Sequence, residues 1–544
     1  MFIEPVFGKK FFGREEVLGT LQKRVTALKG GYRQNLALAG PMLTGKSSIL
    51  RHFLAGIKDA EVLPIYVELA GDDFPAFSRR MMATLLFQYL KSAGIKSSSD
   101  LEALKSAAMP TIPDTVHCVE HILRALKARK VDLAYEALLG LTSVFKSETG
   151  RNCIVILDEF HNISNFKLKK PYQTFGKYIM VQKSTMYIVS SSQKTLLKEI
   201  LSKKLSLLFG NFEVIEVGGF DNQTARAFLS DKMKDMSASD GIADYLIQLC
   251  QGSPFYLEIL AARFAELAHK RHDRYDAKEC LLDALSSVLY ESNGIFNQYF
   301  TNNINFFTDK RSRRSYIQVL VSLAKGASAM KDIQVQLGRS DRELGDKLRR
   351  LQHMDLIHNS GQFYRVSDKL FEYWLRNVYS IKSESVVDDM DIKYVEFKSL
   401  MEKDYCEYTE FRAKRIDAVA KGLFGMFNNQ KIRIGMYDRK LPRFESIEKR
   451  DLEGGVYEVA GRSDGKFWVC RIKEADMADE QDILSFWALK PGDGKSKIVR
   501  KIFIPLKGIE HNAFLLAKEQ NVWVWDTRQF NEMLRLFGKF EIVL

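Results

Sequence analysis

The sequence predicts an α/β protein of several domains, in which the amino-terminal part is built on a parallel sheet. The chain has 544 residues, which is too long for a single core. Five short apolar segments are spaced widely along the first two fifths of the chain, and such segments form parallel sheets covered on both faces. A glycine-rich loop joins the first of them to a helix. The expected strands are Asn35–Gly40, Pro64–Ala70, Cys153–Glu159, Met186–Ser191 and Val214–Gly218.

The loop from Gly40 to Ser47 matches the phosphate-binding pattern G-x-x-x-x-G-K-[ST] at every fixed position. Its glycines let successive backbone N–H groups converge on phosphate oxygens at the positive end of a helix. We predict that Lys46 reaches the outer phosphates of ATP and that the Ser47 hydroxyl binds Mg²⁺. A chance glycine turn is the alternative, which the flanking strand and helix disfavour. The predicted nucleotide contacts in this segment are Gly40, Pro41, Thr44, Gly45, Lys46, Ser47 and Ser48.

The third expected strand ends in two adjacent carboxylates, Asp158 and Glu159. At the carboxyl end of a strand beside the phosphate loop, Asp158 would hold Mg²⁺. Glu159 would polarise the attacking water, so we predict that Glu159 and Lys46 are the catalytic residues. The alternative is an ordinary strand end that meets solvent. The preceding phosphate loop favours the functional interpretation.

The fourth expected strand ends in the polar run Ser190-Ser191-Ser192-Gln193. Its hydroxyls and amide could sense the γ-phosphate or the water that attacks it. Alternatively, Ser191 or Ser192 is the N-cap of a helix over Gln193–Leu201. The two interpretations are compatible, and both stay open.

Beyond the expected sheet, residues 222–305 show helical patterning throughout, and Gly252-Ser253-Pro254 begins one of the helices. We predict a helical lid over the nucleotide. Residues 306–381 then show three helices and a hairpin, which is the order of a winged helix. The third helix, Asp341–Met354, carries Arg342, Arg349 and Arg350 away from its leucines, and we predict that these arginines contact DNA. A solvated helix face in a domain that docks proteins is the alternative.

A polar linker is expected at residues 382–391, followed by a separate α/β module over residues 392–544. The helices expected at its start are Tyr394–Tyr405 and Tyr408–Phe424. The expected strands are Gly455–Ala460, Phe467–Ile472, Ile502–Pro505 and Val522–Trp525, and a last helix begins at Thr527.

With these motifs in order, residues 10–380 resemble the prokaryotic, largely archaeal P-loop ATPases grouped with the STAND and initiator-type AAA+ proteins. The phosphate loop alone is shared by many ATPases, so the resemblance depends on the order of the motifs. The matching residues are Phe12-Gly13-Arg14-Glu15, Thr44-Gly45-Lys46-Ser47, Leu157-Asp158-Glu159-Phe160, Gly252-Ser253-Pro254, and Tyr364-Arg365-Val366-Ser367-Asp368 with Trp374.

The resemblance implies an ASCE-type, AAA+-like parallel sheet with a helical lid, and a nucleotide held between the two. Arg14 would then lie near the adenine, and Gln193 and Pro254 would complete the nucleotide contacts. The implied domains are an ATPase core over 1–221, a lid over 222–305, a winged helix over 306–381 and the carboxyl-terminal module over 392–544.

One departure from this family concerns an arginine that usually stands just before the fifth strand. Here the run reads Leu207-Leu208-Phe209-Gly210-Asn211, and no arginine occurs from Asn152 to Ala225. Loss of such an arginine costs about a thousandfold or more in turnover, whereas ATP binding would survive. Lys203 and Lys204 would substitute less well, because a point charge lacks the planar fork of a guanidinium. We therefore expect slow or conditional ATP hydrolysis.

The last module resembles, more faintly, restriction-endonuclease-like domains of the PD-(D/E)xK type in a degenerate form. Such nucleases hold a metal with acids on two neighbouring strands and use a nearby lysine. Lys473 stands at the lysine position, but Arg471 replaces an acid and Ala460 falls where another acid is common, although Glu458 remains. A cation in place of a metal ligand argues against Mg²⁺ binding, so we predict that this module does not cut nucleic acid.

Composition is compatible with these expectations. The net charge of +13 and a pI near 9.1 permit a polyanionic partner such as DNA. Six scattered cysteines without a C-x-x-C pair, and no apolar stretch long enough for a bilayer, predict a cytoplasmic protein without a membrane segment. The leading hypothesis is an ATP-binding switch whose winged helix and last module contact DNA. Two alternatives are a non-enzymatic signalling or defence scaffold that assembles with itself or recruits protein partners, and an ATP-gated, metal-dependent nuclease.

Overall fold

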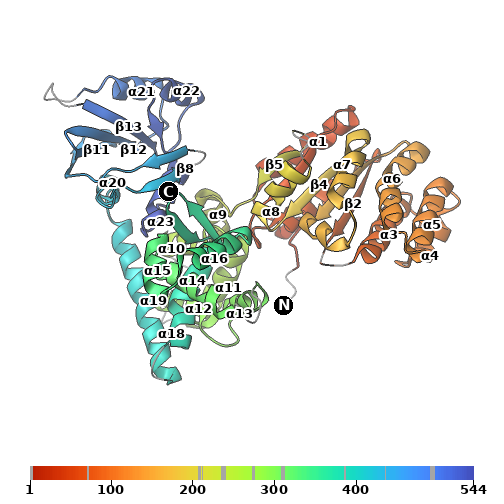
Figure 1. Ribbon diagram of the computed structural model, residues 1–544, viewed down its shortest axis with the longest axis horizontal. Coiled ribbons are helices and arrows are strands. Elements are labelled where there is room, and N and C mark those ends of the chain that lie inside the picture. Colours follow the sequence, from red (N-terminus) through yellow and green to blue (C-terminus); the bar gives the residue numbers. More distant parts are fainter. Residues whose placement is uncertain are drawn as a thin grey trace. The chain divides into compact units, whose positions relative to one another are not determined.

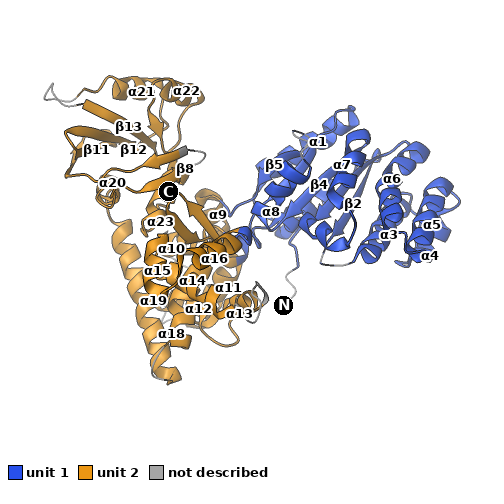
Figure 2. Ribbon diagram, in the orientation of Figure 1, with its two compact units in different colours: residues 1–220, 253–255, 353–355 blue, residues 221–252, 256–352, 356–544 orange. Residues whose placement is uncertain are grey.

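The computed structural model describes most of the chain and divides it into two compact units, which we treat separately (Figure 2). Unit 1 contains residues 1–220, 253–255 and 353–355, and unit 2 contains the rest. The predicted division into four domains is finer and stays a prediction. The described residues are 4–69, 71, 73–205, 210, 212–233, 240–271, 276–307, 313–384, 388–434, 437–490 and 497–543.

Unit 1 is built on a five-stranded sheet in which every neighbouring pair is parallel, so the predicted α/β class with a parallel sheet is confirmed (Figure 1). The strand order is β2-β3-β4-β1-β5, so the first strand in sequence lies between the last two. The strands are β1 (Asn35–Ala39), β2 (Val62–Glu68), β3 (Asn152–Asp158), β4 (Thr185–Ser191) and β5 (Phe212–Glu216).

Both faces of this sheet are buried, which explains why its strands are apolar almost throughout. Alternate residues of β3 point to opposite sides. Ile154 and Ile156 join a core with the helices α1 and α2, whereas Cys153 and Val155 join a core with α3, α6 and α7. The helices of unit 1 are α1 (Glu15–Lys29), α2 (Lys46–Gly56), α3 (Phe74–Ser92), α4 (Leu101–Ala108), α5 (Pro113–Lys127), α6 (Val131–Thr149), α7 (Pro171–Val181) and α8 (Lys194–Glu199).

Unit 2 begins with helices, as the spacing of apolar residues predicts. They are α9 (Asn222–Lys232), α10 (Asp240–Cys250), α11 (Pro254–Arg271), α12 (Ala277–Leu289) and α13 (Ile295–Phe307). Three further helices and a hairpin follow in the predicted order: α14 (Arg313–Ala324), α15 (Met330–Leu337), α16 (Asp341–His353), β6 (Ile357–Ser360) and β7 (Phe363–Val366). A bridge between Ala329 and Phe363 extends the hairpin toward α15.

The segment between the hairpin and the last module differs from the prediction. Residues 369–384 are helical, as α17 (Lys369–Trp374), a π-helical turn η6 (Leu375–Tyr379) and α18 (Ser380–Glu384). A single helix, α19 (Met390–Arg412), spans the expected break at residues 406–407. The expected linker overlaps the end of α18 and the start of α19, and its residues 385–387 lie outside the described residues. Tyr408 is buried, so packing holds this helix together where sequence spacing predicted an interruption.

The last module contains a five-stranded mixed sheet in the order β10-β11-β12-β13-β14. The hairpin β8–β9 and the edge strand β10 were missed from the sequence, because they are short, charged and mostly exposed. The elements are α20 (Ile416–Phe424), β8 (Lys431–Ile434), β9 (Tyr437–Lys440), β10 (Ser446–Asp451), β11 (Val456–Ser463), β12 (Lys466–Lys473), α21 (Glu480–Trp487), β13 (Lys497–Pro505), α22 (His511–Glu519), β14 (Trp523–Val524) and α23 (Thr527–Leu536).

Among the described residues, none of the helices combines the length and the apolar character that a membrane span requires.

Candidate nucleotide-binding site

The glycine-rich loop connects β1 to α2, as the sequence predicts. Leu43 and Gly45 adopt left-handed backbone conformations, with φ of 65° and 90°, so the chain turns sharply before the helix begins at Lys46. Thr44 Oγ1 donates to the carbonyl oxygen of Pro41 at 2.9 Å. Lys46 is buried, and its Nζ donates to the carbonyl oxygens of Gly40 at 2.9 Å and Pro41 at 2.7 Å. The loop is therefore curled around the lysine ammonium group.

Burial also changes the acid–base behaviour of this lysine. Removal of its ammonium group from water lowers the pKa of Lys46, although the neighbouring carboxylates of Glu159 and Asp158 oppose the shift. The ammonium group thus lies between loop carbonyls and an acidic edge of the sheet. A phosphate oxygen would supply the Lys46 ammonium group with a charge-assisted hydrogen bond in place of the loop carbonyls.

Gly40 is required by its surroundings, and we predict that Gly40→Ala destabilises unit 1. A Cβ atom at this position would lie 2.0 Å from the carbonyl oxygen of Val217, which is backbone and cannot move aside cheaply. The expected loss is about 1–3 kcal/mol in the free energy of unfolding, measured by urea denaturation. Gly19→Ala is the matched control, because nothing lies within 4 Å of its added Cβ in α1. Equal stability of the two variants would contradict the prediction.

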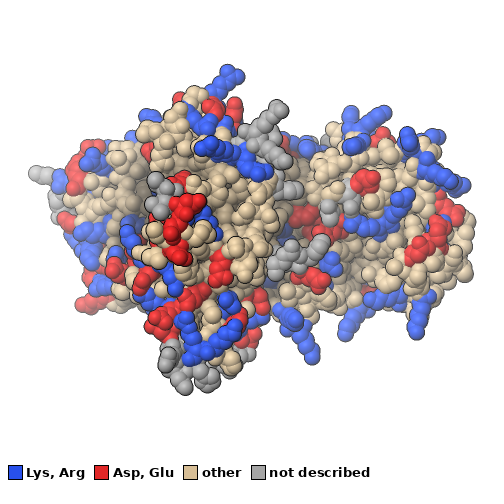
Figure 3. All heavy atoms as spheres, turned by 90° about the horizontal axis from the view of Figure 1, so that it is seen from below, with Lys and Arg blue, Asp and Glu red and all other residues tan. Residues whose placement is uncertain are grey.

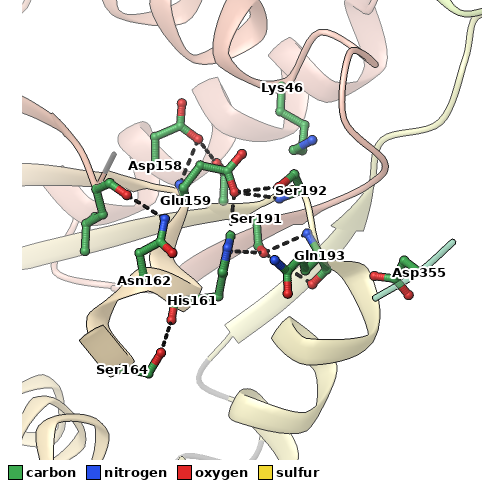
Figure 4. Close-up of polar contacts among 12 residues, drawn as sticks. Lys46, Asp158, Glu159, His161, Asn162, Ser164, Ser191, Ser192, Gln193 and Asp355 are labelled. Atoms are coloured by element: carbon green, nitrogen blue, oxygen red, sulfur yellow. Dashed lines mark hydrogen bonds and ion pairs between the residues drawn. The ribbon is translucent and has the colours of Figure 1, made fainter. Parts of the chain in front are cut away.

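Asp158, which Figure 4 shows near Glu159, lies at the carboxyl end of β3. Its carboxylate accepts hydrogen bonds from three hydroxyl groups. Ser47 Oγ donates to its Oδ2 at 2.6 Å, Tyr66 Oη donates to the same oxygen at 2.7 Å, and Ser190 Oγ donates to Oδ1. The Asp158 carboxylate is nearly inaccessible to solvent, with 1% of the residue exposed. The two predicted Mg²⁺ ligands, Ser47 and Asp158, are thus brought together from positions 111 residues apart in sequence.

These groups are suitable for magnesium. A hydroxyl and a carboxylate are hard oxygen donors, which Mg²⁺ prefers, and the two atoms are in direct contact. Glu68 is a third acid at this edge, since it is paired with Asp158 across β2 and β3. Burial, followed by the charge of Asp158, raises the pKa of Glu68. Sequence analysis missed Glu68 and Tyr66, because only the pairing of β2 with β3 places them here.

Glu159 follows Asp158 in a left-handed backbone conformation with φ of 54°, which turns its side chain away from the strand. Its Oε2 accepts hydrogen bonds from the backbone N–H and the Oγ of Ser192, both at 2.9 Å. His161 Nδ1 lies 3.3 Å from the same oxygen and 2.8 Å from Ser191 Oγ. Figure 4 shows Glu159 pointing toward Ser192 and His161.

Burial raises the pKa of Glu159, although its bonds to Ser192 oppose the shift. Burial, with the charge of Lys46 adding to it, lowers the pKa of His161 to about 4, so this ring is neutral near pH 7. The Glu159 carboxylate is thus held by the backbone N–H and the hydroxyl of Ser192, next to the neutral ring of His161. Sequence analysis did not single out His161, because a histidine three residues after Asp158 carries no pattern of its own.

The pKa of Glu159 leads to a pH prediction for ATP hydrolysis. A general base must be ionised, so turnover should fall as the pH drops through its pKa. Because burial raises that pKa, the acidic limb should lie above pH 4.5, the ordinary value for a glutamate. Single-turnover hydrolysis at saturating Mg-ATP measures it. A limb centred at or below pH 4.5 would contradict the burial argument, and Glu159→Gln serves as the control that should lack the limb.

Neither serine that the sequence analysis proposed as a helix N-cap has that role in the structure. The helix α8 begins at Lys194, and its N-cap is Gln193, which makes no side-chain capping bond. Neither Ser191 nor Ser192 is the N-cap, so that alternative is wrong. Ser191 Oγ instead accepts from the backbone N–H of Gln193 at 3.1 Å, and Ser192 is bonded to Glu159. The helix α8 begins one residue later than the expected Gln193.

Arg14 lies beside the phosphate loop. Its guanidinium donates to the carbonyl oxygens of Gly218 at 2.6 Å, Gly219 at 3.3 Å and Thr44 at 3.1 Å, and it lies over the ring of Phe220. The residues before it cross α2, where Ser48 Oγ accepts from the backbone N–H of Val6 at 3.0 Å. Ser48 thus anchors the amino-terminal segment. Pro254 is the first residue of α11 and belongs to unit 1, in which Ser253 Oγ lies 3.5 Å from the carbonyl oxygen of Leu43.

The run in which the family's arginine is missing falls mostly outside the described residues. Residues 206–209 and 211 lie outside the described residues, so the run Leu207–Asn211 and any substitution by a nearby lysine stay predictions. Lys204, which the structure describes, lies over the ring of Tyr172.

In unit 2, the three arginines of α16 are exposed, as the sequence predicts. Arg349 forms an ion pair with Asp346, and Arg350 lies over the ring of Tyr316. Leu344, Leu348 and Leu351 form the buried face of the same helix. Figure 3 shows one face of the molecule, on which basic and acidic side chains are interspersed.

In the last module, Arg471 of β12 is bonded to Glu458 of β11. Its Nε and Nη2 donate to Glu458 Oε1 at 2.9 and 2.6 Å, and both side chains are largely buried. Lys473 Nζ lies 2.7 Å from an oxygen of Asp482 and 2.9 Å from one of Asp476. A guanidinium group therefore occupies the space beside Glu458 that a metal ion would need.

Comparisons with known proteins bear on unit 1 above all. Residues 10–169 match the family model described as AAA ATPase domain. The match includes the phosphate loop and the Asp158–Glu159 pair and covers less than a third of the chain. No curated protein matches the chain significantly.

Several solved structures are similar to the chain at low sequence identity. A Walker-type ATPase of Pyrococcus abyssi is 16% identical, with a TM-score of 0.48 over 69% of this chain and 99% of that one. The Aeropyrum pernix ORC2 protein is 11% identical, with a TM-score of 0.42 over 73% and 97%. The Aeropyrum pernix ORC1 protein in complex with DNA is 14% identical, with a TM-score of 0.35 over 68% and 93%. These structural similarities are low, with TM-scores below 0.5. The comparison that concerns the nucleotide-binding site is therefore the match of residues 10–169 to the AAA ATPase family model.

Proposed function

We propose that this chain is an ATP-binding switch that hydrolyses ATP slowly or conditionally and contacts DNA. The observation that carries the nucleotide proposal is the contact of Ser47 with Asp158 at the end of β3, one residue before Glu159 and beside the loop around Lys46. The AAA ATPase match over residues 10–169 supports the same proposal. These four side chains come from two segments that sheet pairing brings together.

In this proposal each residue has a defined task. Backbone N–H groups from Gly40 to Ser48 surround the phosphates, and Lys46 exchanges its loop carbonyls for β- and γ-phosphate oxygens. Ser47 and Asp158 would hold Mg²⁺, which would neutralise charge that develops on the phosphates. Glu159 accepts the proton of the attacking water. Arg14, Gln193 and Pro254 stay the proposed additional nucleotide contacts.

Conditional hydrolysis has a geometric basis in addition to the missing arginine. Glu159 Oε2 already accepts two hydrogen bonds from Ser192. To act on water, the carboxylate has to share or leave these donors, so any movement of the β4 end would alter its reactivity. The end of β4 is therefore the place where the state of the γ-phosphate and the state of Glu159 would be coupled.

DNA contact is proposed through α16, because its exposed arginines lie opposite a buried leucine face. The test is DNA binding by the full chain across a salt series, with and without Mg-ATP. We expect that changing both Arg342 and Arg350 to alanine weakens binding about tenfold and lowers the salt dependence by about two charges. Lys331→Ala is an exposed control on α15 that should change little. Affinity that is independent of salt would contradict phosphate contacts.

A scaffold without DNA affinity is the second candidate, and the local pairing of Arg349 with Asp346 favours it. Its signature in the same experiment is a change of oligomeric state on ATP addition with no DNA binding at any salt concentration. The nuclease hypothesis is disfavoured by the Arg471–Glu458 ion pair, since a buried guanidinium repels a metal ion.

A further inference from the structure

Unit 2 contains a cavity of about 400 Å³ that has no role in the proposed ATPase reaction. Its wall combines residues of α10, β7, α17, η6, α19, the end of α14, and the segment from α23 to Phe540. Cavities of 300–1,000 Å³ are the usual size of small-molecule sites. The side chains that line the cavity determine which class of ligand it can bind.

Positive charge predominates among the residues that line this cavity. Six lining residues are lysine or arginine, whereas three are acidic, namely Glu372, Asp404 and Glu407. Arg365 of β7, Lys369 of α17 and Arg535 of α23 act on one another electrostatically, since Arg535 lowers the pKa of both other cations. Burial is the larger cause of both shifts. Three like charges gathered at a cavity wall favour an anion between them.

The hydrogen bonds of the two arginines are incomplete. Arg365 is 8% exposed, and its Nη2 donates to the carbonyl oxygen of Leu536 at 2.8 Å. Arg535 Nη2 donates to the carbonyl oxygens of Val366 at 2.9 Å and Ser367 at 3.0 Å. The Nε atoms of both arginines are buried without a hydrogen-bond partner. Each guanidinium therefore anchors backbone on one side and has donor capacity left on another.

Carboxylates near these cations neutralise them only in part. Glu372 lies 4.0 Å from Arg365, and Glu541 lies 3.4 Å from Lys369. Burial raises the pKa of three other acids in this region, Asp368, Asp404 and Glu532. Asp368 also accepts from Tyr256 Oη at 2.6 Å, and Asp404 accepts from Tyr245 Oη at 2.8 Å.

We propose that this cavity binds a small organic phosphate of about mononucleotide size, separate from the ATP held by the phosphate loop. Arg365, Lys369 and Arg535 bind the phosphate group through charge-assisted hydrogen bonds. Phe537 and Phe540, which also line the cavity, contact the organic part. Occupancy would link β7 and α17 to α23, because the three cations come from these three elements.

The test uses the full chain with Lys46→Ala, which removes most binding at the phosphate loop. Calorimetry with AMP should show one site per chain, inorganic phosphate should compete for it, and adenosine should bind at least tenfold more weakly than AMP. Absence of heat with both AMP and phosphate would overturn the proposal, as would equal binding of adenosine and AMP.

Two further variants in the same background locate the site. Lys369→Met should weaken AMP binding roughly tenfold or more. Lys539→Ala, at an exposed position of the cavity wall, should weaken it severalfold. Lys466→Ala, an exposed lysine of β12 outside the wall, is the control. If Lys539→Ala and Lys369→Met both bind AMP as the control does, the assignment to this cavity is wrong. The outcome is independent of ATP hydrolysis in unit 1.

Discussion

Glu159→Gln will retain ATP and lose turnover, by about a hundredfold to ten-thousandfold, the range that a general base contributes. Glutamine keeps the size of the side chain and an oxygen that can accept from the backbone N–H of Ser192, so the fold of the site should persist. It cannot take a proton from water. Because Lys46, Ser47 and Asp158 are untouched, ATP affinity should stay within about threefold. Rapid-quench hydrolysis and calorimetry on the same preparation measure the two quantities.

A matched control for this variant is Glu68→Gln, at the end of the neighbouring strand. Glu68 is also an acid with a raised pKa, and it is paired with Asp158 across the sheet, but it is not the residue that follows the aspartate in the turn. We expect its turnover to remain within severalfold of the unmodified chain. Equal turnover in Glu159→Gln and the unmodified chain would remove Glu159 from the proposed chemistry.

Lys46→Ala should weaken ATP binding itself, by about a hundredfold. The lysine ammonium is buried and held by the carbonyls of Gly40 and Pro41, so it is in position before the nucleotide arrives. A charge-assisted hydrogen bond in such a site is worth up to about 3 kcal/mol, which corresponds to roughly two orders of magnitude in affinity. Calorimetric titration with Mg-ATP measures the change.

Lys23→Ala is the control for this titration, because Lys23 is exposed on α1 of the same unit. Its affinity for ATP should match that of the unmodified chain. If Lys46→Ala binds ATP as tightly as Lys23→Ala, the glycine-rich loop is not the nucleotide site and the proposed switch has no basis.

Sequence reasoning succeeded where the information is local. The strand before Gly40, the turn at Gly45 and the helix from Lys46 follow one another along the chain, so a contiguous pattern describes them. The same holds for Asp158 and Glu159 at the end of an apolar strand. It failed at α19, where burial of residues such as Tyr408 sustains a helix across an expected break, and at β8 and β9, which are only four residues long each.

The amino-acid order was enough to indicate a phosphate loop, an acidic strand end and a parallel sheet, because each depends on residues that are neighbours in the chain. The surroundings of the two acids depended on the strand order β2-β3-β4-β1-β5. That order places Tyr66, Ser190 and Ser192 against Asp158 and Glu159 from strands far away in sequence. Hydrogen bonds of this kind require short distances between side chains, and such distances arise only when the helices and strands pack.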